Sequence, residues 1–237
     1  MFAGAGGLGT GFIESGFNII SANDIWKAAG ETYIKNHPKV KYIIKDISEL
    51  KSSELLNETG YLAKDIDVII GGPPCQGFST LGKRFIDDPR NKLFKEYVRI
   101  VSEIKPKIFV MENVSGILSM QKGKVLENII NSFKSIGYNI EYKLLNAAEY
   151  GVPQQRERTI FIGTRLDVKI RFPKQTHSVN KKSKYKKAIT LWEAISDLPK
   201  NNKDDICDYV CLPLNAYQKQ MREENLFVTN HKSPVHN

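Results

Sequence analysis

The sequence predicts an α/β fold built on a doubly wound, mainly parallel sheet. Short apolar runs of strand length alternate with amphipathic helical patterns through about the first 165 residues, and a glycine-rich turn opens the chain. Polar or flexible residues also follow the apolar runs. Because such sheets bind ligands beyond the carboxyl ends of their strands, we expect one ligand site along that rim.

Each expected element follows from a local pattern. Four runs are rich in β-branched residues and bounded by Gly, Pro, Asp or Asn, which indicates buried strands at 18–24, 41–46, 65–72 and 106–113. Apolar residues at helical spacing predict helices over 93–104 and 125–136, the second stopped by Gly137. The later runs 138–151 and 158–165 are strand-like, and we expect them to pair as an antiparallel hairpin at the sheet edge.

The regular alternation stops near residue 165. We therefore expect one domain over residues 1–165, followed by a basic linker and the incomplete start of a small second domain over 166–237. Of the formal net charge of +9, most lies between residues 165 and 189, where nine Lys or Arg accompany one acidic residue. This segment indicates a polyanionic partner such as nucleic acid, or alternatively a solvated lysine-rich loop.

The composition also bears on the compartment. No run of eighteen apolar residues occurs, and the amino terminus lacks a basic-then-apolar export pattern, so we expect no membrane partner and a cytoplasmic location. The three cysteines Cys75, Cys207 and Cys211 have no disulfide-framework spacing, which suits a reducing environment. Cys207 and Cys211 lack a second ligand pair, so no metal site is expected.

The opening "GAGGLG" is a glycine turn, and Asp24 follows about twenty positions later. Glycines let the backbone approach a ligand closely, and an acid at the next strand end can accept both ribose hydroxyls. The pattern fits a nicotinamide dinucleotide, and hence an oxidoreductase, but it fits any adenosine-type cofactor equally well. A plain tight turn, with Asp24 and Asp46 as strand-end caps, is the structural alternative.

The stretch "GGPPCQGFST" presents Cys75 directly after two prolines at the end of an apolar run. Prolines stiffen the backbone, so this thiol is a candidate nucleophile, although a lone cysteine is more often a buried apolar residue. Arg156 and Arg158 can supply the positive field that favours a thiolate.

Glu112 follows the apolar run "KIFVM" and is expected to face Cys75 across the ligand crevice. The four histidines do not belong to the polar residues that follow the predicted strands, and this argues against a cysteine–histidine pair. They are His37, His177, His231 and His236. A nucleophilic cysteine with a carboxylic acid suits addition to an electron-poor ring that is protonated as the thiolate attacks, and cytosine is such a ring.

Four ordered motifs resemble the DNA cytosine-5 methyltransferase family: "FAGAGGLG", "GGPPCQGFS", "MENV" and "GVPQQRERTIFIG". The similarity runs from Phe2 to about Arg165 and, more loosely, to about residue 200. It implies a Rossmann-like fold that binds S-adenosyl-L-methionine. It further implies a catalytic and cofactor-binding domain over 1–165 and the start of a target recognition domain after it.

The resemblance also assigns roles to individual residues. It implies a cofactor site made of Phe2, Gly4, Gly6, Gly7, Asp24, Asp46, Ile47, Pro74 and Leu93. In the catalytic set, Cys75 adds to carbon 6 of the target cytosine, Glu112 protonates ring nitrogen 3, and Arg156 and Arg158 steady the flipped nucleotide. The implied reaction is methyl transfer to carbon 5 of cytosine in double-stranded DNA, as part of a restriction-modification or related system.

The match is incomplete at both ends. The family has a full strand before its glycine loop, whereas only Met1 precedes Phe2, and the chain stops early in the variable recognition region. We therefore expect a fragment, a decayed gene product, or one half of a split enzyme with a companion chain. The alternative function is a subunit that binds DNA or a partner chain but is inactive alone.

Overall fold

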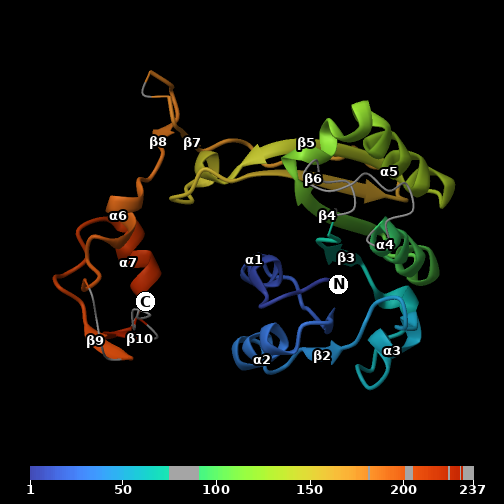
Figure 1. Cartoon of the computed structure of the whole chain (residues 1–237), viewed down its shortest axis with the longest axis horizontal. Coiled ribbons are helices and arrows are strands. Elements are labelled where there is room, and N and C mark those ends of the chain that lie inside the picture. The colour runs from blue at the N-terminus through green and yellow to red at the C-terminus, as the bar shows by residue number, and fades with distance from the viewer. Residues whose placement is uncertain (75–90, 181, 201–204, 224, 230, 232–237) are drawn as a thin grey trace. The chain divides into compact units, whose positions relative to one another are not determined.

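The computed structural model describes residues 1–74, 91–180, 182–200, 205–223, 225–229 and 231 (Figure 1). The chain divides into two compact units. The first comprises residues 1–145 and 157–172, and the second comprises 146–156 and 173–237. The expected functional division at residue 165 stays a prediction.

The first unit carries the α/β alternation that the sequence predicts. Its described helices and strands are α1 (Gly7–Glu14), β1 (Ser21–Asp24), α2 (Lys27–Asn36), β2 (Lys41–Ile44), α3 (Ser52–Leu56), β3 (Val68–Gly71), α4 (Asn91–Ile104), β4 (Ile108–Val114), α5 (Lys124–Ser135), β5 (Asn139–Asn146) and β6 (Glu157–Thr164). Short 3-10 turns lie at Ala63–Asp65, Ser115–Leu118 and Met120–Gly123. Gly137, at φ 88°, follows the end of α5 as expected of a glycine stop.

The strands form a mainly parallel arrangement with an antiparallel edge hairpin, which confirms the predicted Rossmann-like fold class. β1 pairs in parallel with β2, and β3 pairs in parallel with β4. β6 runs antiparallel to β4, and β5 lies outside β6 at the edge. Among the described residues the strands belong to two separate sheets, β1-β2 and β3-β4-β6-β5, because no strand hydrogen-bonds to both β1 and β3.

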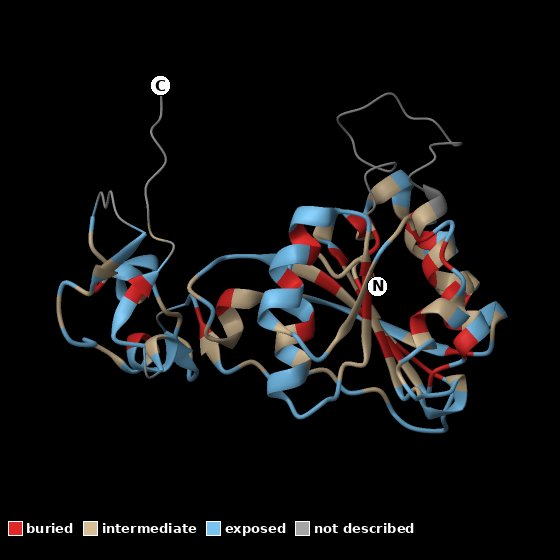
Figure 2. Ribbon diagram, turned by 90° about the horizontal axis from the view of Figure 1, so that it is seen from below, coloured by how far each residue is buried: buried red, intermediate tan, exposed pale blue. Residues whose placement is uncertain are grey.

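Figure 2 colours the buried residues of the first unit red. Among them, an aromatic cluster joins α4, β4 and α5. Tyr97, Phe109 and Phe133 are fully buried, and the rings of Phe109 and Phe133 stack with centroids 3.9 Å apart. The Tyr97 hydroxyl donates to the carbonyl oxygens of Ile69 (3.3 Å) and Val110 (3.1 Å), and so ties β3 to β4 from within the core. Burial raises the pKa of Tyr97 well above its ordinary value.

The second unit consists of short elements. Its described helices and strands are β7 (His177–Ser178), β8 (Lys186–Lys187), α6 (Leu191–Ile195), β9 (Ile206–Asp208), α7 (Ala216–Arg222) and β10 (Phe227–Thr229), after a 3-10 turn at Ala147–Tyr150. Arg222 makes a buried ion pair with Asp197 at 2.7 Å and lies over the ring of Tyr209. Several large apolar side chains are more than half exposed, including Trp192, Leu212 and Leu226. The expected start of a second domain after residue 165 stays a prediction.

No helix among the described residues has the length and apolar character needed to cross a membrane.

The register of β4 against β6 depends on a glycine, Gly163, whose lack of a side chain leaves room for the Phe109 ring. Phe109 lies opposite Gly163, and a Cβ added at Gly163 would stand 1.9 Å from Cε1 of the Phe109 ring. We expect Gly163→Ala to lower the free energy of unfolding by about 2–3 kcal/mol, because the stacked ring has no room to move. Urea denaturation measures this effect.

Gly11→Ala is the matched control. Gly11 lies inside α1, and an added Cβ there meets nothing within 4 Å. Alanine is the better helix former, so this change should leave the protein equally stable or stabilise it by up to ~1 kcal/mol. Equal stabilities for the two variants would contradict the packing argument.

Candidate functional site

Polar groups of the first unit gather at the carboxyl ends of its strands, as the sequence predicts. Asp24 is the last residue of β1, and Asp46 lies two residues beyond β2. Residues 72–74 follow β3, and Glu112 lies near the end of β4. This rim is where an open α/β sheet binds its ligands.

Asp24 fastens the opening glycine loop to the end of β1. Its Oδ2 accepts a 2.8 Å hydrogen bond from the Gly4 N–H, and its Oδ1 accepts one of 3.0 Å from the Trp26 N–H. Gly4 and Gly6 have φ of 52° and 106°, a left-handed backbone that favours glycine. A Cβ added at Gly4 or Gly7 would meet nothing within 4 Å, so both glycines border open space.

These features fit a nucleoside cofactor. Each Asp24 oxygen has a second lone pair, which leaves the carboxylate able to accept further hydrogen bonds from ribose hydroxyls. The open space beside Gly4 and Gly7 leaves room for a ligand against the backbone. Phe2, at φ 53°, begins this loop. The cofactor roles of these residues stay predictions.

Trp26 is a candidate that sequence reasoning missed. It directly follows Ile25 after Asp24, and its side chain is 68% exposed although it is a large aromatic residue. An aromatic face next to an acid that is predicted to bind ribose suits stacking against a purine. The signal in the sequence was an aromatic residue just beyond the acid at a strand end.

Asp46 and Ile47 lie in the turn after β2. Asp46 Oδ1 accepts hydrogen bonds from the Ser48 N–H (2.8 Å) and the Ser48 hydroxyl (2.7 Å), so this carboxylate does cap the turn. Ile47 is buried in the main core, with 3% exposure. Leu93, on α4, packs against the same core from a half-buried position.

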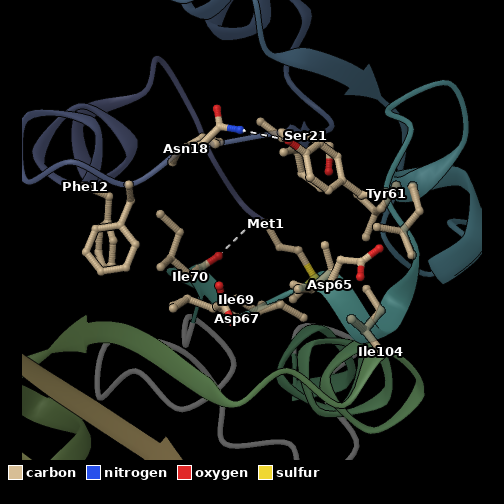
Figure 3. A pocket seen from close by; sticks show the side chains of 18 of the residues that line it. Met1, Phe12, Asn18, Ser21, Tyr61, Asp65, Asp67, Ile69, Ile70 and Ile104 are labelled. Atoms are coloured by element: carbon tan, nitrogen blue, oxygen red, sulfur yellow. Dashed lines mark hydrogen bonds between the residues drawn. The ribbon is translucent and has the colours of Figure 1, made fainter.

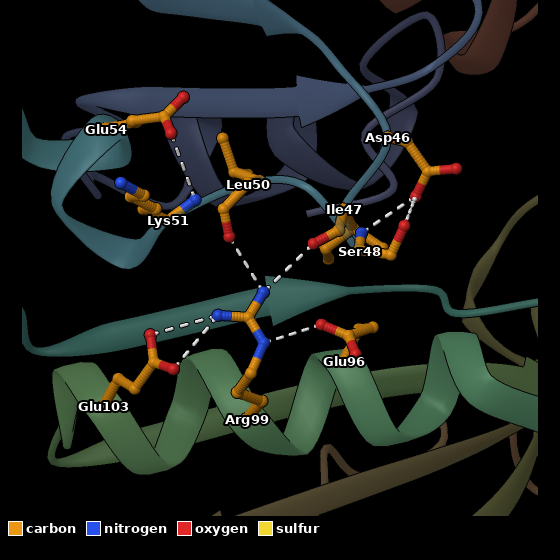
Figure 4. Close-up of polar contacts among 9 residues, drawn as sticks. All are labelled: Asp46, Ile47, Ser48, Leu50, Lys51, Glu54, Glu96, Arg99 and Glu103. Carbon is orange, nitrogen blue, oxygen red and sulfur yellow. Dashed lines mark hydrogen bonds and ion pairs between the residues drawn. The ribbon is translucent and has the colours of Figure 1, made fainter.

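Arg99 holds this turn from the neighbouring helix α4 (Figure 4). Its Nη2 donates to the carbonyl oxygens of Ile47 (3.0 Å) and Leu50 (2.8 Å). Glu96, at 2.6 Å, and Glu103, at 3.0 Å, fix the guanidinium through ion pairs. Sequence reasoning missed Arg99, because a helix face with charges at three- and four-residue spacing usually lies in solvent.

Glu112 and Arg158 form an ion pair on the outer face of β4 and β6. Arg158 Nε lies 2.6 Å from Glu112 Oε1, and both side chains are about one-quarter to one-third exposed. The register explains this contact: Glu112 lies opposite Ile160, and Arg158 opposite Val114. The two are therefore diagonal neighbours on one face of the sheet.

The segment that leads to Cys75 passes directly beside Glu112. A Cβ added at Gly72 would stand 3.2 Å from Glu112 Oε2, so only glycine passes there without crowding the carboxylate. The next residue along, Pro73, has its carbonyl oxygen bound by the Asn113 Nδ2 at 2.9 Å. The ends of β3 and β4 thus hold the backbone up to Pro74.

Two further predicted residues are not described as part of this set. Cys75 lies outside the described residues. Arg156 belongs to the second unit, where it is exposed, its N–H donates to Asn146 Oδ1 (3.3 Å) and its carbonyl oxygen accepts from the Ala147 N–H. The described residues contain no group of three or more His, Cys, Asp or Glu that could hold a metal ion.

The basic segment between residues 165 and 189 presents its charges to solvent. All of its described cations are exposed: Arg165, Lys169, Arg171, Lys174, Lys182, Lys184, Lys186 and Lys187. None of these described residues forms an ion pair with a described acid. These positive charges are therefore available to a polyanion.

An α/β fold in which a strand-end acid binds a glycine loop defines the class of Rossmann-like proteins. The sequence model of the C-5 cytosine-specific DNA methylase family matches residues 1–234, and the chain belongs to this family.

Curated relatives and solved structures agree with this assignment. The chain is 42% identical over 244 residues to the type II methyltransferase M.DdeI of Desulfomicrobium norvegicum, and 43% identical over 235 residues to M.MthTI of Methanothermobacter thermautotrophicus. A crystal structure of an E. coli prophage protein described as a DNA modification methyltransferase covers the whole chain with a TM-score of 0.77 at 26% identity. A DNMT2 variant from Spodoptera frugiperda covers 73% of the chain, with a TM-score of 0.57.

The chain is shorter than most of these proteins. It spans 57% of M.DdeI and 62% of M.MthTI, and it covers 71% of the E. coli protein. By contrast, the match covers 87% of the type II methyltransferase M.AquIA of Picosynechococcus, at 38% identity, so that relative is of similar length.

Arg99 makes a testable contribution to the turn after β2. Arg99→Met removes the donor of two carbonyl hydrogen bonds, so we expect the free energy of unfolding to fall by about 1–3 kcal/mol. We also expect faster hydrogen exchange over residues 46–51. Denaturant titration and hydrogen-exchange mass spectrometry measure these effects.

The control is Glu103→Gln, which removes one partly exposed ion-pair partner and leaves both carbonyl bonds in place. Its expected cost is below about 0.5 kcal/mol. If the two variants lose equal stability, the carbonyl bonds are not what holds the turn.

Proposed function

We propose that this chain is the cofactor-binding and cytosine-binding part of a DNA cytosine-5 methyltransferase that uses S-adenosyl-L-methionine. The observation that carries the proposal is the Glu112–Arg158 pair beside the Gly72–Pro74 segment, in a member of the C-5 cytosine-specific methylase family. It brings the Glu112 carboxyl group beside Gly72, which is three residues before Cys75 in the sequence.

The glycine loop and the three neighbouring strand ends would hold the cofactor. Asp24 would accept the ribose hydroxyls, with Phe2, Gly4, Gly6 and Gly7 forming the loop against the ligand. Asp46 and Ile47 would contact the adenine, Trp26 would offer its exposed ring, and Pro74 and Leu93 would complete the site. When bound, S-adenosyl-L-methionine supplies an electrophilic methyl group.

The protein residues then prepare cytosine to receive that group. The Cys75 thiolate adds to carbon 6, and Glu112 gives a proton to ring nitrogen 3. This addition would place electron density on carbon 5, which would bond to the methyl carbon as that carbon's bond to the cofactor sulfur breaks and a neutral thioether leaves. Loss of the carbon 5 proton then expels the thiolate and restores the ring.

The two oxygens of the Glu112 carboxyl group have different neighbours. Arg158 engages Oε1 at 2.6 Å, whereas Oε2 faces the Gly72 segment. We assign Oε2 to the hydrogen bond with ring nitrogen 3, with Arg158 fixing the orientation of the carboxyl. Arg156 and Arg158 would also steady the flipped nucleotide and its phosphates.

DNA is the proposed substrate, with the target cytosine turned out of the double helix. Extracting a base costs a few kcal/mol, which contacts to the DNA have to offset. The exposed cations between residues 165 and 189 suit this task, because each one near a phosphate releases counterions. Relatives named type II methyltransferases support a role in restriction-modification. The proposed DNA substrate supports a cytoplasmic location.

A second candidate is a subunit that binds DNA or a companion chain and needs that chain for activity. It is favoured by the exposed apolar side chains of the second unit. Labelled methyl incorporation into DNA, with and without a companion chain, separates the two candidates. The nicotinamide alternative gains no support from the family match.

Substitution of the nucleophile tests the proposal. We expect Cys75→Ala to abolish methyl transfer to DNA while leaving the affinity for S-adenosyl-L-methionine nearly unchanged, because the thiol reacts with the base and not with the cofactor. Transfer of labelled methyl groups and calorimetric titration measure the two properties. Cys207→Ala is the control with full activity, and an active Cys75→Ala variant would refute the nucleophile assignment.

Substitution of the acid tests the second catalytic role. We expect Glu112→Gln to lower the single-turnover rate by roughly a hundredfold to ten-thousandfold, as loss of a general acid does. Glu141→Gln, at an exposed position of β5, should leave the rate unchanged. An unaltered rate in Glu112→Gln would remove this residue from the mechanism.

A further inference from the structure

Three aromatic side chains of the first unit pack together beside the opening glycine loop, and we call them the α2–β2 aromatic group: Tyr33, His37 and Tyr42. Tyr33 lies on α2, His37 directly follows that helix, and Tyr42 lies on β2. The ring centroids of His37 and Tyr42 lie 4.9 Å and 4.8 Å from the centroid of Tyr33, which is buried. The three rings therefore form one connected group.

The glycine loop contacts this group at Gly6 and borders open space at Gly4 and Gly7. A Cβ added at Gly6 would stand 3.0 Å from Tyr33 Cδ2 and 3.1 Å from His37 Nε2. A Cβ added at Gly4 or Gly7 would meet nothing within 4 Å. The rings thus lie against the backbone of the loop, and space for a ligand remains next to them.

Both backbone polar groups of Gly4 are bound by side chains of two paired strands. Asp24, at the end of β1, accepts from the Gly4 N–H at 2.8 Å, and the Tyr42 hydroxyl, on β2, donates to the Gly4 carbonyl oxygen at 3.2 Å. Burial and the negative charge of Asp24 raise the pKa of Tyr42 to about 12, so the hydroxyl keeps the proton that it donates. These two bonds fix a residue with φ of 52°, a left-handed conformation.

His37 reaches the second left-handed glycine, Gly6, through Thr10. The Thr10 hydroxyl donates to the Gly6 carbonyl oxygen at 3.0 Å, and its oxygen lies 3.1 Å from His37 Nε2. A hydroxyl has one proton to donate, so the proton between Thr10 and His37 belongs to Nε2 of the imidazole. His37 therefore donates to Thr10, and Thr10 joins the first turns of α1 to Gly6.

Gly30, in the interior of α2, makes room for the Tyr42 ring. A Cβ added at Gly30 would stand 2.6 Å from Tyr42 Cε1, so alanine there would force the ring to move. Glycine inside a helix is less favourable than alanine, because it loses more backbone entropy on folding. The helix thus contains an unfavourable residue at the point where the Tyr42 ring passes.

We propose that Tyr42 and His37 are positioning residues for the S-adenosyl-L-methionine site. Tyr42 acts through Gly4, and His37 acts through Thr10 and Gly6. Together they hold the loop in its left-handed conformation before the cofactor arrives, so that binding does not have to order the loop. The inference rests on the proposed function, which names the cofactor, and it adds residues that act on the site through the loop.

The test compares two substitutions that each remove one tyrosine hydroxyl from the full chain. Tyr42→Phe removes the donor to Gly4 and keeps the ring. The matched control is Tyr61→Phe, because Tyr61 lines a cavity of about 330 Å³ that no member of the α2–β2 aromatic group lines. Figure 3 shows Tyr61 and Asn18 at that cavity, where the Asn18 amide donates to the Tyr61 hydroxyl at 3.4 Å.

We expect Tyr42→Phe to raise the Kd for S-adenosyl-L-methionine and for S-adenosyl-L-homocysteine by about three- to tenfold, since a smaller fraction of the free protein has the binding-competent loop. Hydrogen exchange over residues 4–10 of the free protein should become faster. Tyr61→Phe should change neither property. Calorimetric titration and hydrogen-exchange mass spectrometry measure them, and a folded Tyr42→Phe chain with the Kd and the exchange of the unsubstituted chain would overturn the proposal.

His37 is tested by loss and rescue of its donor. We expect His37→Ala to raise both Kd values by about three- to tenfold, and His37→Gln, whose amide can donate to Thr10, to return them to within about twofold of the unsubstituted chain. A role in overall stability alone would lower the Tm without this pattern in Kd. Equal Kd values for the alanine and glutamine variants would remove His37 from the positioning residues.

The unsubstituted chain separates this inference from the proposed function. If it binds neither S-adenosyl-L-methionine nor S-adenosyl-L-homocysteine, the proposed function fails, and the inference fails with it. If it binds them and Tyr42→Phe binds them equally well, the proposed function stands and only the positioning roles are wrong.

Discussion

The antiparallel pairing of β4 with β6 is the constraint on which the candidate site depends. It places Arg158 diagonally across from Glu112 and joins the two side chains at 2.6 Å. A shift of one residue in this register would turn one partner to the opposite face of the sheet. The Phe109 ring, packed over Gly163 and stacked on Phe133, holds the register from the core face. Strand β4 therefore carries core residues such as Phe109 on one face and the Glu112 carboxyl group on the other.

The remaining parts of the site are backbone segments held by side chains. Asp24 binds the glycine loop, Arg99 binds the turn after β2, and Asn113 binds the carbonyl of Pro73. Each of these segments follows or precedes a short strand and has few regular hydrogen bonds of its own. A charged or amide side chain supplies the missing partners, and such bonds are stronger than those between neutral groups. The rim is thus preorganised before any ligand binds.

Much of the first unit could be predicted from local sequence. The β-branched runs predicted β1 to β4. The structure confirms that Asp24 ends β1, and it places Glu112 two residues before the end of β4. The ion pair between Glu112 and Arg158 could not be predicted, because it depends on a register between residues far apart in the chain. Arg99 was missed for the same reason, since its partners Ile47 and Leu50 lie on another segment. The expectation that Glu112 faces Cys75 across a ligand crevice stays a prediction.

The most direct test of the account is the bond between protein and base. With 5-fluorocytosine in a substrate duplex, carbon 5 carries no proton to lose after methyl transfer, so the thiolate cannot be expelled and the adduct persists. Mass spectrometry of the digested complex, formed with S-adenosyl-L-methionine and any companion chain, identifies the attached residue. The account predicts DNA bound through the sulfur of Cys75. Methylation of ordinary cytosine by the same preparation without an adduct, or with an adduct at another residue, would contradict it.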